Sequence, residues 1–421
     1  MPAPEHAAAT SALASHDVLR PAPKGFKGWI SGAMLRSLPT LFGLARAAWP
    51  IPKLGKKVVA TRYDDVIEVF ENDRAFAVTY KKNLDVIMDR QPFFLSMDDT
   101  PAYHAGRDAM LRVVRREDIA QRLAPQAEAM AEAIVAGAGG RVEVVSQLVR
   151  PVTFDMLGDY FGVPKPPNGD LQVWATRLFE FQFADDGSKD LRDAVDAIGP
   201  ALRGHIDNEL ARRRASPEKK DDVLGRCLEL QAQGEPGYSD VEIRTALTGM
   251  IVGGPPQPPM VVPQAMEQLL RRPDALAGAQ AAARAGDDAL LSNYVREAMR
   301  FDPIAPAMLR IAVADATIAA GTRRARHVPK GATVLAAMAS AMMDRRKVAE
   351  PSRFDPARPA DNYIHFGHAL HQCFGIHINK GTLHLMLKPL LRRSNLRRAS
   401  GRDGHLSKRG PFADRLVVLY D

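Results

Sequence analysis

The chain has 421 residues, two cysteines and a formal net charge of +8, and 46% of its residues are hydrophobic. Two cysteines cannot build a disulfide framework, which excludes the small disulfide-rich secreted class and indicates a reducing compartment. The basic residues are mixed with acidic ones and form no motif with interleaved aromatic residues, so we expect no nucleic acid as partner.

Residues 1–27 are rich in alanine, proline and polar residues, which predicts a disordered leader. They contain no uninterrupted apolar core, so they form neither a secretory signal nor a membrane span. Residues 30–49 are apolar but interrupted by Arg36, Pro39 and Arg46. We predict that they form the first helix of the body; contact with a membrane surface is the alternative, favoured if the substrate is a lipid. The chain is thus expected to be soluble and cytoplasmic, without a transmembrane anchor.

The remaining sequence is mainly helical in pattern, with short strands. Strands are predicted at residues 57–63 and, after a turn, near the end of the segment 410–420. Residues 77–100 show no helical period and are predicted to be a loop. Helical spacing is seen around 104–115, 118–137 and 143–160. Because no linker or internal repeat interrupts residues 28–421, we predict one large domain, mainly α with small β-sheets.

A further helix is predicted from residue 239 onward, where Ser239 and Glu242 form a capping box before an apolar helical repeat. Its continuation reads Gly253-Gly-Pro-Pro-Gln-Pro-Pro259, with Pro263 following. A proline inside a helix removes an N–H group, clashes with the preceding turn and costs about 3 kcal/mol or more. We therefore predict that this helix breaks or widens between 253 and 259.

Glu297 and Arg300 lie in a segment that reads as a helix ended by Pro303. Residues three apart share a helix face, so the two charges can meet. Alone, such a pair is a common surface feature worth a few tenths of a kcal/mol.

The segment Phe366-Gly-His-Ala-Leu-His-Gln-Cys-Phe-Gly375 is the most informative stretch of the chain. A thiolate at Cys373 is suited to bind iron, because N–H groups at the start of the following helix favour ionised sulfur. The segment resembles the cysteine loop of the cytochrome P-450 family: Phe366 lies seven residues before Cys373, His371 two before and Gly375 two after. Ala369 stands where the family usually has glycine, which we interpret as a mild steric change.

This resemblance, which extends over nearly the whole chain, implies a cytochrome P-450-like fold of the soluble bacterial type. It implies haem b (iron protoporphyrin IX) as cofactor and Cys373 as axial iron ligand, with Phe366, Gly367 and Gly375 in the loop around it. Haem carries two propionates, which need cationic or hydrogen-bonding partners. The positions that match the family's propionate ligands are Arg107, Arg310, His371 and either Tyr103 or His104, of which we favour Tyr103.

The resemblance also assigns structural and pocket residues. Glu297 and Arg300 would join Arg353, in Arg353-Phe-Asp-Pro356, in the triad that supports the haem-binding face. Phe179 and Phe183 lie in a stretch similar to the roof of the family's active site, and Phe412 lies near a tip that reaches the pocket in relatives. A core role for the aromatic residues of that stretch is equally open.

The proline-rich segment departs from the family pattern, which has an acid and a threonine after a glycine pair. Here Gly253 and Gly254 are followed by Pro256 at the position of the acid and Gln257 at that of the threonine. In the family this pair organises delivery of protons to dioxygen. Proline cannot ionise, and an amide is no acid at ordinary pH, whereas a peroxide arrives already reduced and protonated.

Three functions remain open. The first is a monooxygenase that oxidises a hydrophobic small molecule with electrons from a ferredoxin-type donor, Gln257 and water relaying protons. The second is a peroxide-dependent peroxygenase or fatty-acid hydroperoxide isomerase. The third is a non-catalytic haem sensor or binding protein. We expect a monomer, in which a basic surface that includes Arg392, Arg393, Arg397, Arg398 and Lys408 would suit an acidic electron donor.

Overall fold

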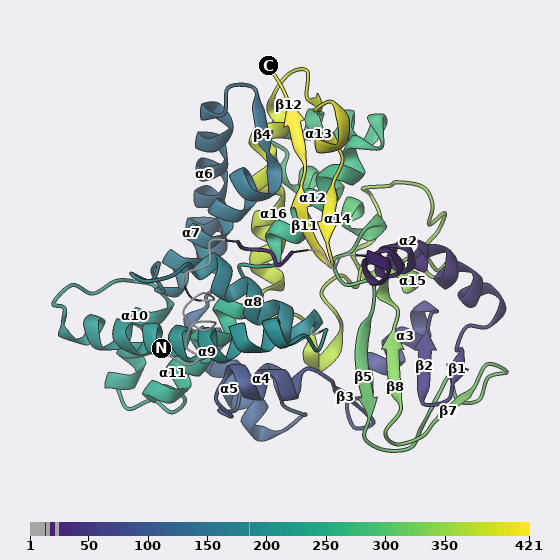
Figure 1. Cartoon of the computed structure of the whole chain (residues 1–421), viewed down its shortest axis with the longest axis horizontal. Helices are drawn as coiled ribbons and strands as arrows, with labels where there is room; N and C mark the ends of the chain where they lie inside the picture. Colours follow the sequence, from purple (N-terminus) through teal and green to yellow (C-terminus); the bar gives the residue numbers. More distant parts are fainter. Residues whose placement is uncertain (1–12, 14–16, 22–24, 185) are drawn as a thin grey trace. The chain divides into compact units, whose positions relative to one another are not determined.

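The computed structural model describes residues 13, 17–21, 25–184 and 186–421, with the backbone alone for 25–36. The chain forms two compact units. Figure 1 labels their helices and strands. The first comprises the residues up to Arg20 together with Tyr80–Met260, and the second comprises Pro21–Thr79 together with Val261–Asp421. Along the described part of the chain, no helix is both long and apolar enough to cross a membrane.

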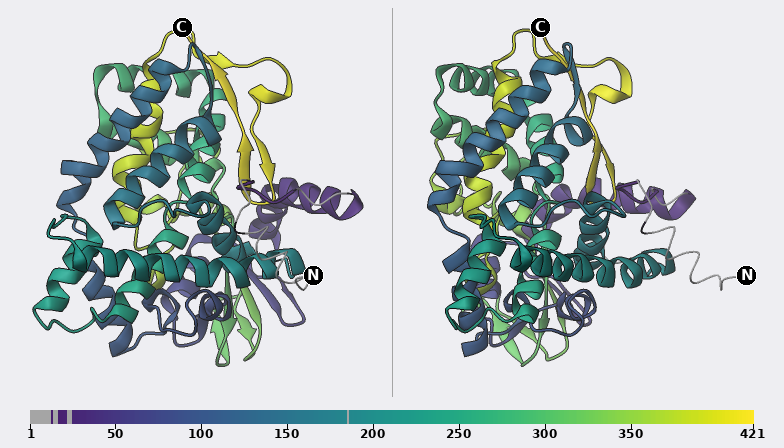
Figure 2. Two further views of the ribbon diagram at one scale, coloured as in Figure 1. Left: turned by 60° about the vertical axis from the view of Figure 1, so that its left-hand side comes forward. Right: turned by 90° about the vertical axis from the view of Figure 1, so that its left-hand side faces the viewer.

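The first unit is almost entirely helical. The long helix α9 (Lys189–Ala215) runs across the direction of α6 (Ala124–Gly137) in Figure 2. Two π-helical turns, Ile119–Leu123 and Val144–Val149, precede α6 and α7, and each of these two helices has a proline in its first turn. The other elements are α4 (Lys81–Ile87), a 3-10 turn (Phe94–Ser96), α5 (Pro101–Val113), β4 (Arg141–Glu143), α7 (Arg150–Phe161), α8 (Leu171–Ala184), α10 (Val223–Ala232), α11 (Asp240–Gly253) and the start of α12 (Pro258–Leu270).

Two sequence predictions are wrong in this unit. Residues 77–100 are not free of helix, because α4 and a 3-10 turn lie within them. Residues 17–20 of the predicted leader are held by α8: the Arg177 guanidinium donates to the carbonyls of Asp17 and Val18, at 2.7 and 2.6 Å. The Arg20 guanidinium in turn binds the Glu180 carboxylate at 2.8 Å. The positions 1–12, 14–16 and 22–24 of that leader lie outside the described residues.

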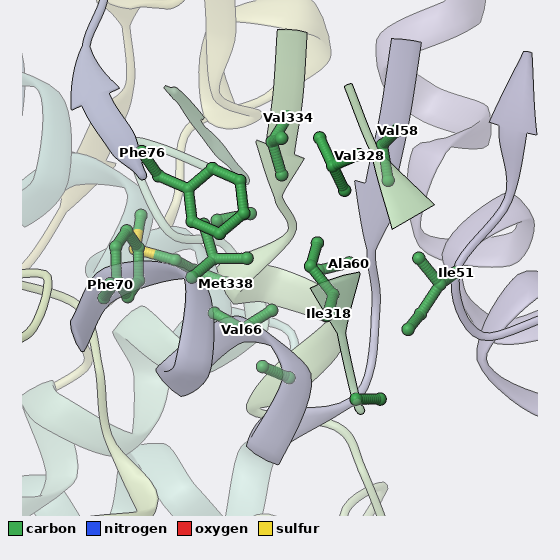
Figure 3. Close-up of a cluster of buried hydrophobic side chains, with 14 of the residues drawn as sticks. Ile51, Val58, Ala60, Val66, Phe70, Phe76, Ile318, Val328, Val334 and Met338 are labelled. Carbon is green, nitrogen blue, oxygen red and sulfur yellow. The ribbon is translucent and has the colours of Figure 1, made fainter. Parts of the chain in front are cut away.

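The second unit contains a five-stranded sheet of order β1-β2-β8-β5-β3. Strands β2 and β8 are parallel, and the other neighbours are antiparallel. Helix α3 (Tyr63–Glu71) places Val66 and Phe70 in a buried cluster with the strand residues Val58, Phe76 and Val334 (Figure 3). Burying such side chains contributes roughly 1.5–3 kcal/mol each. The strands are β1 (Lys53–Leu54), β2 (Lys57–Ala60), β3 (Phe76–Val78), β5 (Met308–Ala312) and β8 (Thr333–Ala336).

The rest of the second unit is mainly helical, with short hairpins. Helices α13 and α14 pack against each other and against α16. These elements are α2 (Gly25–Ala48), α13 (Pro273–Ala285), α14 (Asp288–Phe301), β6 (Ala316–Ile318), β7 (Arg326–Val328), α15 (Met338–Ala341), α16 (Ile376–Arg392), β9 (Arg397–Arg398), β10 (Ser407–Arg409), β11 (Phe412–Arg415) and β12 (Val417–Leu419). Both units together confirm the predicted class, mainly α with small β-sheets.

Candidate haem-thiolate site

Helix α11 begins with the predicted capping box, in which the Ser239 hydroxyl and the Glu242 carboxylate satisfy each other's backbone N–H groups. The helix ends at Gly253, as the prolines require. After this break a new helix, α12, starts at Pro258. Its first two residues are prolines, whose missing N–H groups cost nothing at positions where no intrahelical partner exists. The predicted break is thus confirmed.

The amide of Gln257 stabilises this break. Its side-chain N–H donates to the carbonyl of Gly253, which would otherwise lack a helical partner at the end of α11. The backbone carbonyl of Gln257 accepts the N–H of Met260 at 2.9 Å and so starts α12. Gln257 therefore caps both helices, a structural role that sequence reasoning did not foresee. Pro256 is buried and offers no group that can ionise.

Two glycines on one face of α11 have contrasting surroundings. A Cβ atom on Gly249 would lie 2.3 Å from the ring of Phe93, so only glycine allows the ring to lie on the helix there. One turn later, a Cβ atom on Gly253 would meet no atom within 4 Å. The helix is therefore covered by Phe93 at Gly249 and has open space at Gly253. Sequence reasoning missed Phe93, because no motif marks the loop in which it lies.

The cysteine loop lies directly before α16, with Gly375 as the residue that precedes the helix. The N–H of Cys373 donates to the carbonyl of Phe366 at 2.8 Å, which closes the loop. Gly367 has φ = +74°, in the left-handed region that favours glycine. Ala369 has φ = +57°. Its substitution for the usual glycine is therefore more than a mild steric change, because a left-handed conformation costs a non-glycine residue about 1–2 kcal/mol.

The thiol of Cys373 is partly buried and accepts the N–H of Gly375. Burial raises the pKa of this thiol to about 11, and the hydrogen bond from Gly375 acts in the opposite direction. The direction of the Gly375 contribution agrees with the prediction that N–H groups at the helix start favour ionised sulfur. A metal ion that binds such a thiol displaces its proton.

The Glu297–Arg300 pair is fully buried, with nitrogen and oxygen 2.6 Å apart. The predicted third member, Arg353, is wrong: its side chain is 67% exposed and pairs with Glu350 at 3.1 Å. Arg358 takes its place, with Nε 3.1 Å from the buried carboxylate of Glu297. Only the backbone carbonyl of Arg353 enters the network, where it accepts from both buried arginines. The loop turns between the two positions, so that the later arginine points inward.

Two further groups complete the hydrogen bonding of Glu297. The phenol of Tyr363 donates to it at 2.9 Å, and the backbone N–H of Asp355 donates at 3.0 Å. Burial and the neighbouring carboxylate raise the pKa of Tyr363, which keeps the phenol a donor. Tyr363 lies ten residues before Cys373, so the network holds the entry to the cysteine loop. Tyrosine in an irregular segment gave no sequence signal for this role.

The proposed propionate partners divide between the two units. In the second unit, Arg310 is buried with its guanidinium over the ring of Phe70. His371 is partly buried, at the end of a 3-10 turn.

The other three candidates lie on α5 in the first unit. Tyr103 is buried, whereas His104 is exposed and pairs with Asp99 at 2.7 Å. The preference for Tyr103 over His104 as a propionate partner stays a prediction. The side chain of Arg107 is exposed, 3.6 Å from the carboxylate of Asp108, so its role as a propionate partner stays a prediction.

The predicted pocket aromatics are brought together only in part. The rings of Phe179 and Phe183 on α8 are 5.0 Å apart, and Tyr80 lies edge-on to Phe183 at 5.2 Å. Phe179 is buried and Phe183 is exposed. Phe412 is buried in the other unit, on β11.

The basic residues proposed for a donor surface mostly bind partners within the chain. Arg398 pairs with the buried Glu267 at 2.6 Å, and Lys408 pairs with Asp302 at 2.9 Å. Arg392 donates to the carbonyl of Ala283 at 3.2 Å. These contacts stabilise the fold, and they count against a basic donor surface formed by this set.

The residues present fit a haem group. A cysteine with one N–H donor to its sulfur provides a single soft axial ligand for iron. The left-handed Gly367 lets the backbone turn closely beside it. A buried arginine, Arg310, provides a cation for an acidic group.

Comparisons with known proteins agree with this reading. The family model described as "Cytochrome P-450" matches residues 188–417, more than half of the chain. The vitamin D(3) 25-hydroxylase of Pseudonocardia autotrophica is 26% identical over 360 residues, 82% of this chain and 83% of the relative. The mycinamicin IV hydroxylase/epoxidase of Micromonospora griseorubida is 25% identical over 362 residues, 81% and 83% of the two chains.

Solved structures share the fold. The ligand-free structure of cytochrome P-450 TbtJ1 gives a TM-score of 0.76 at 21% identity, covering 92% of this chain and 98% of that one. CalO2 gives the same TM-score at 20% identity, covering 92% and 97%. The sequence match over residues 188–417, which include α11, the Glu297 network and the cysteine loop, decides the assignment: the chain belongs to the cytochrome P-450 family, whose members are haem monooxygenases.

Proposed function

We propose that this protein is a haem-thiolate monooxygenase that inserts oxygen into an apolar small molecule, with Cys373 as the axial ligand of haem b. One observation carries the proposal: a partly buried cysteine in a closed loop, its sulfur hydrogen-bonded to Gly375 at the start of α16. Relatives named as hydroxylases and epoxidases support the reaction class. The domain would begin at residue 17 rather than 28, because Asp17, Val18 and Arg20 bind α8.

When bound, haem supplies the redox chemistry that transfers one oxygen atom to an unreactive substrate. The chain's own residues would hold and orient it. The Gly375 N–H tempers the donor strength of the sulfur, as hydrogen bonds to ligand sulfur generally do. Arg310, His371 and Tyr103 would bind the propionates, and the buried Glu297 network would fix the segment that leads into the cysteine loop.

The substrate would be apolar, since the relatives include a vitamin D(3) hydroxylase and α8 presents the paired rings of Phe179 and Phe183. Ring faces bind apolar molecules by burial and favour no charged group. Phe93 would limit the space along α11, because its ring covers the helix at Gly249, whereas a Cβ atom on Gly253, one turn later, would meet no atom within 4 Å. A ferredoxin-type protein would supply the electrons.

A peroxide-dependent reaction is the second candidate, and the break after α11 favours it. Residues 253–259 contain no side chain that ionises, and the N–H of Gln257 is used to cap Gly253. The delivery of protons to dioxygen would therefore depend on water, whereas a hydroperoxide brings its own proton.

The ligand assignment is tested by the spectrum of the reduced carbon monoxide complex. Cys373→Ala should abolish the thiolate-type spectrum, and Cys227→Ala is the matched control. Cys227 is a buried residue of α10 and lies outside the cysteine loop, so its removal should leave the spectrum unchanged. An unaltered spectrum in Cys373→Ala would refute the assignment.

The oxidant is tested by an isotope experiment with a panel of fatty acids and their hydroperoxides. One reaction contains labelled dioxygen, NADPH, ferredoxin and its reductase, and the other contains unlabelled hydroperoxide without air. Label in the product supports the monooxygenase, and product in the airless reaction alone supports the peroxide-dependent enzyme. A thiolate spectrum with no product in either reaction would favour a haem sensor or binding protein.

A further inference from the structure

The last three turns of α2 have an unusual outer face. Leu41 is 51% exposed and Leu44 is 64% exposed, and Trp49, just after the helix, is 45% exposed. The charged residue of these turns, Arg46, donates to the hydroxyl and the carbonyl of Ser340 on α15, at 2.8 and 2.9 Å. The outer face of a surface helix normally carries charged residues. Here that face is apolar.

The hairpin that follows α2 shows the same feature. Leu54, at the end of β1, is 74% exposed, beside the turn at Gly55. Lys56 and Lys57 are exposed on the other side of that turn. The hairpin is anchored behind them, because Val58 is buried in the core of the sheet (Figure 3). Leu54 is therefore held outward by a firmly packed strand pair. Figure 1 shows the chain passing from the end of α2 into this hairpin.

The charge of this part of the chain is one-sided. Residues 25–62 contain seven lysines and arginines and no aspartate or glutamate, whereas the whole chain has a net charge of +8. Nearly all the net positive charge thus lies in 38 of 421 residues. Two of the three tryptophans, Trp29 and Trp49, lie there as well. Tryptophan with leucine and lysine is the composition of segments that lie in a membrane interface.

We propose that α2 and the β1–β2 hairpin form a membrane-docking surface for an anionic phospholipid bilayer. Leu41, Leu44, Trp49 and Leu54 would enter the boundary between headgroups and acyl chains, while Lys56 and Lys57 bind the headgroups. The surface lies on the bilayer and does not span it. A second copy of this chain is a poor occupant, because it would bring the same one-sided positive charge to the contact. The proposal is independent of the haem-thiolate function.

The test is co-flotation of the purified full-length protein, with its haem, on vesicles. One set consists of phosphatidylcholine alone, and the other contains about 30% phosphatidylglycerol. We expect binding to the anionic vesicles that weakens at high salt, and at least tenfold weaker binding to the neutral ones. With Trp29→Phe, brominated lipid should quench the fluorescence of Trp49, which is exposed, and not that of Trp174, which is buried.

Substitutions separate the apolar and the ionic contributions to vesicle binding. Lys56→Gln with Lys57→Gln should weaken binding about 20-fold, since each lysine near an anionic surface contributes about fivefold or more. Leu44→Ser should weaken it about tenfold. The control Leu290→Ser removes a leucine that is also exposed, but on α14, and should change nothing.

Three outcomes would overturn the proposal. Equal binding to neutral and anionic vesicles would remove the role of the lysines, and unchanged binding by Leu44→Ser would remove that of the helix face. Concentration-dependent self-association that Leu44→Ser abolishes, without vesicle binding, would assign the surface to a contact between copies. None of these readouts measures oxygenation, so failure here leaves the proposed function untouched.

Discussion

The network around Glu297 and the break after α11 satisfy their polar groups differently: the first shares hydrogen bonds among several charged residues, and the second needs few hydrogen bonds. Glu297 is buried among two arginines, a phenol and a backbone N–H, so each member depends on the others. In the break, prolines need no hydrogen bonds, and one amide caps the Gly253 carbonyl. Removing one member of a shared charge network leaves a buried charge without its partner and lowers the free energy of unfolding strongly. In a break whose groups are satisfied locally, single residues can be substituted with smaller losses. Accordingly, the family's Glu-x-x-Arg pair is kept in the first region, and its acid–threonine pair is lost in the second.

Replacement of Arg358 or Arg353 by methionine, in separate variants, gives the largest expected difference in the free energy of unfolding. Arg358→Met leaves Glu297 buried with one cation fewer and should lower the free energy of unfolding by about 3–5 kcal/mol. Arg353→Met removes only an exposed ion pair and should cost less than about 0.5 kcal/mol. Urea unfolding of both variants checks this. A larger loss from Arg353→Met would restore the original triad and contradict the structure.

The covered face of α11 gives the next largest effect. Gly249→Ala should lower the free energy of unfolding by about 1–3 kcal/mol, because the new methyl group collides with the ring of Phe93. Gly249→Ala combined with Phe93→Leu should recover part of that loss, which thermal unfolding of the double-mutant cycle measures. Gly253→Ala, the control on the same face, should not destabilise the protein. Equal losses of unfolding free energy in Gly249→Ala and Gly253→Ala would show that the loss comes from the backbone conformation and not from collision with the Phe93 ring.

The cap on Gly253 gives a smaller effect. Gln257→Ala removes the amide donor and should cost about 1 kcal/mol of unfolding free energy. Gln257→Glu keeps the length of the side chain but loses the donor, so it should cost at least as much. Turnover per haem is measured in parallel: if the amide also positions oxygen or peroxide, turnover falls well beyond the change in stability. Unchanged rates and products would remove Gln257 from the mechanism and leave it a cap.

The comparison also shows what the sequence predicts. The capping box at Ser239, the break before Pro258 and the Glu297–Arg300 pair depend on spacing within one helix or on the chemistry of proline, and all three were predicted. Arg358 and Tyr363 were not, because they lie in an irregular segment without a period. There, only the fold decides which side chain turns inward.

The prediction for residues 17–20 of the N-terminal segment was wrong for a related reason. Its composition indicates disorder, but composition carries no information about a distant partner. Residues 17–20 are ordered by buried Arg177 and by Glu180 on α8, about 160 residues away along the chain. The same limit applies to Phe93, whose place against Gly249 follows from packing between distant segments.

Relief of backbone strain in the cysteine loop gives the smallest expected effect. Ala369→Gly should raise the free energy of unfolding by up to about 1 kcal/mol, because the left-handed strain disappears while the unfolded chain gains freedom. Ala319→Gly is the comparison, since Ala319 has φ = +56° in a turn far from the loop in sequence; its methyl group is buried, so the packing lost on its removal offsets part of the gain. Similar gains in both variants, with an unshifted spectrum of the carbon monoxide complex, would mean that the strain at Ala369 is incidental. A gain at Ala369 with a shifted spectrum would mean that this strain helps to set the position of the Cys373 sulfur, and no gain at either alanine would contradict the strain itself.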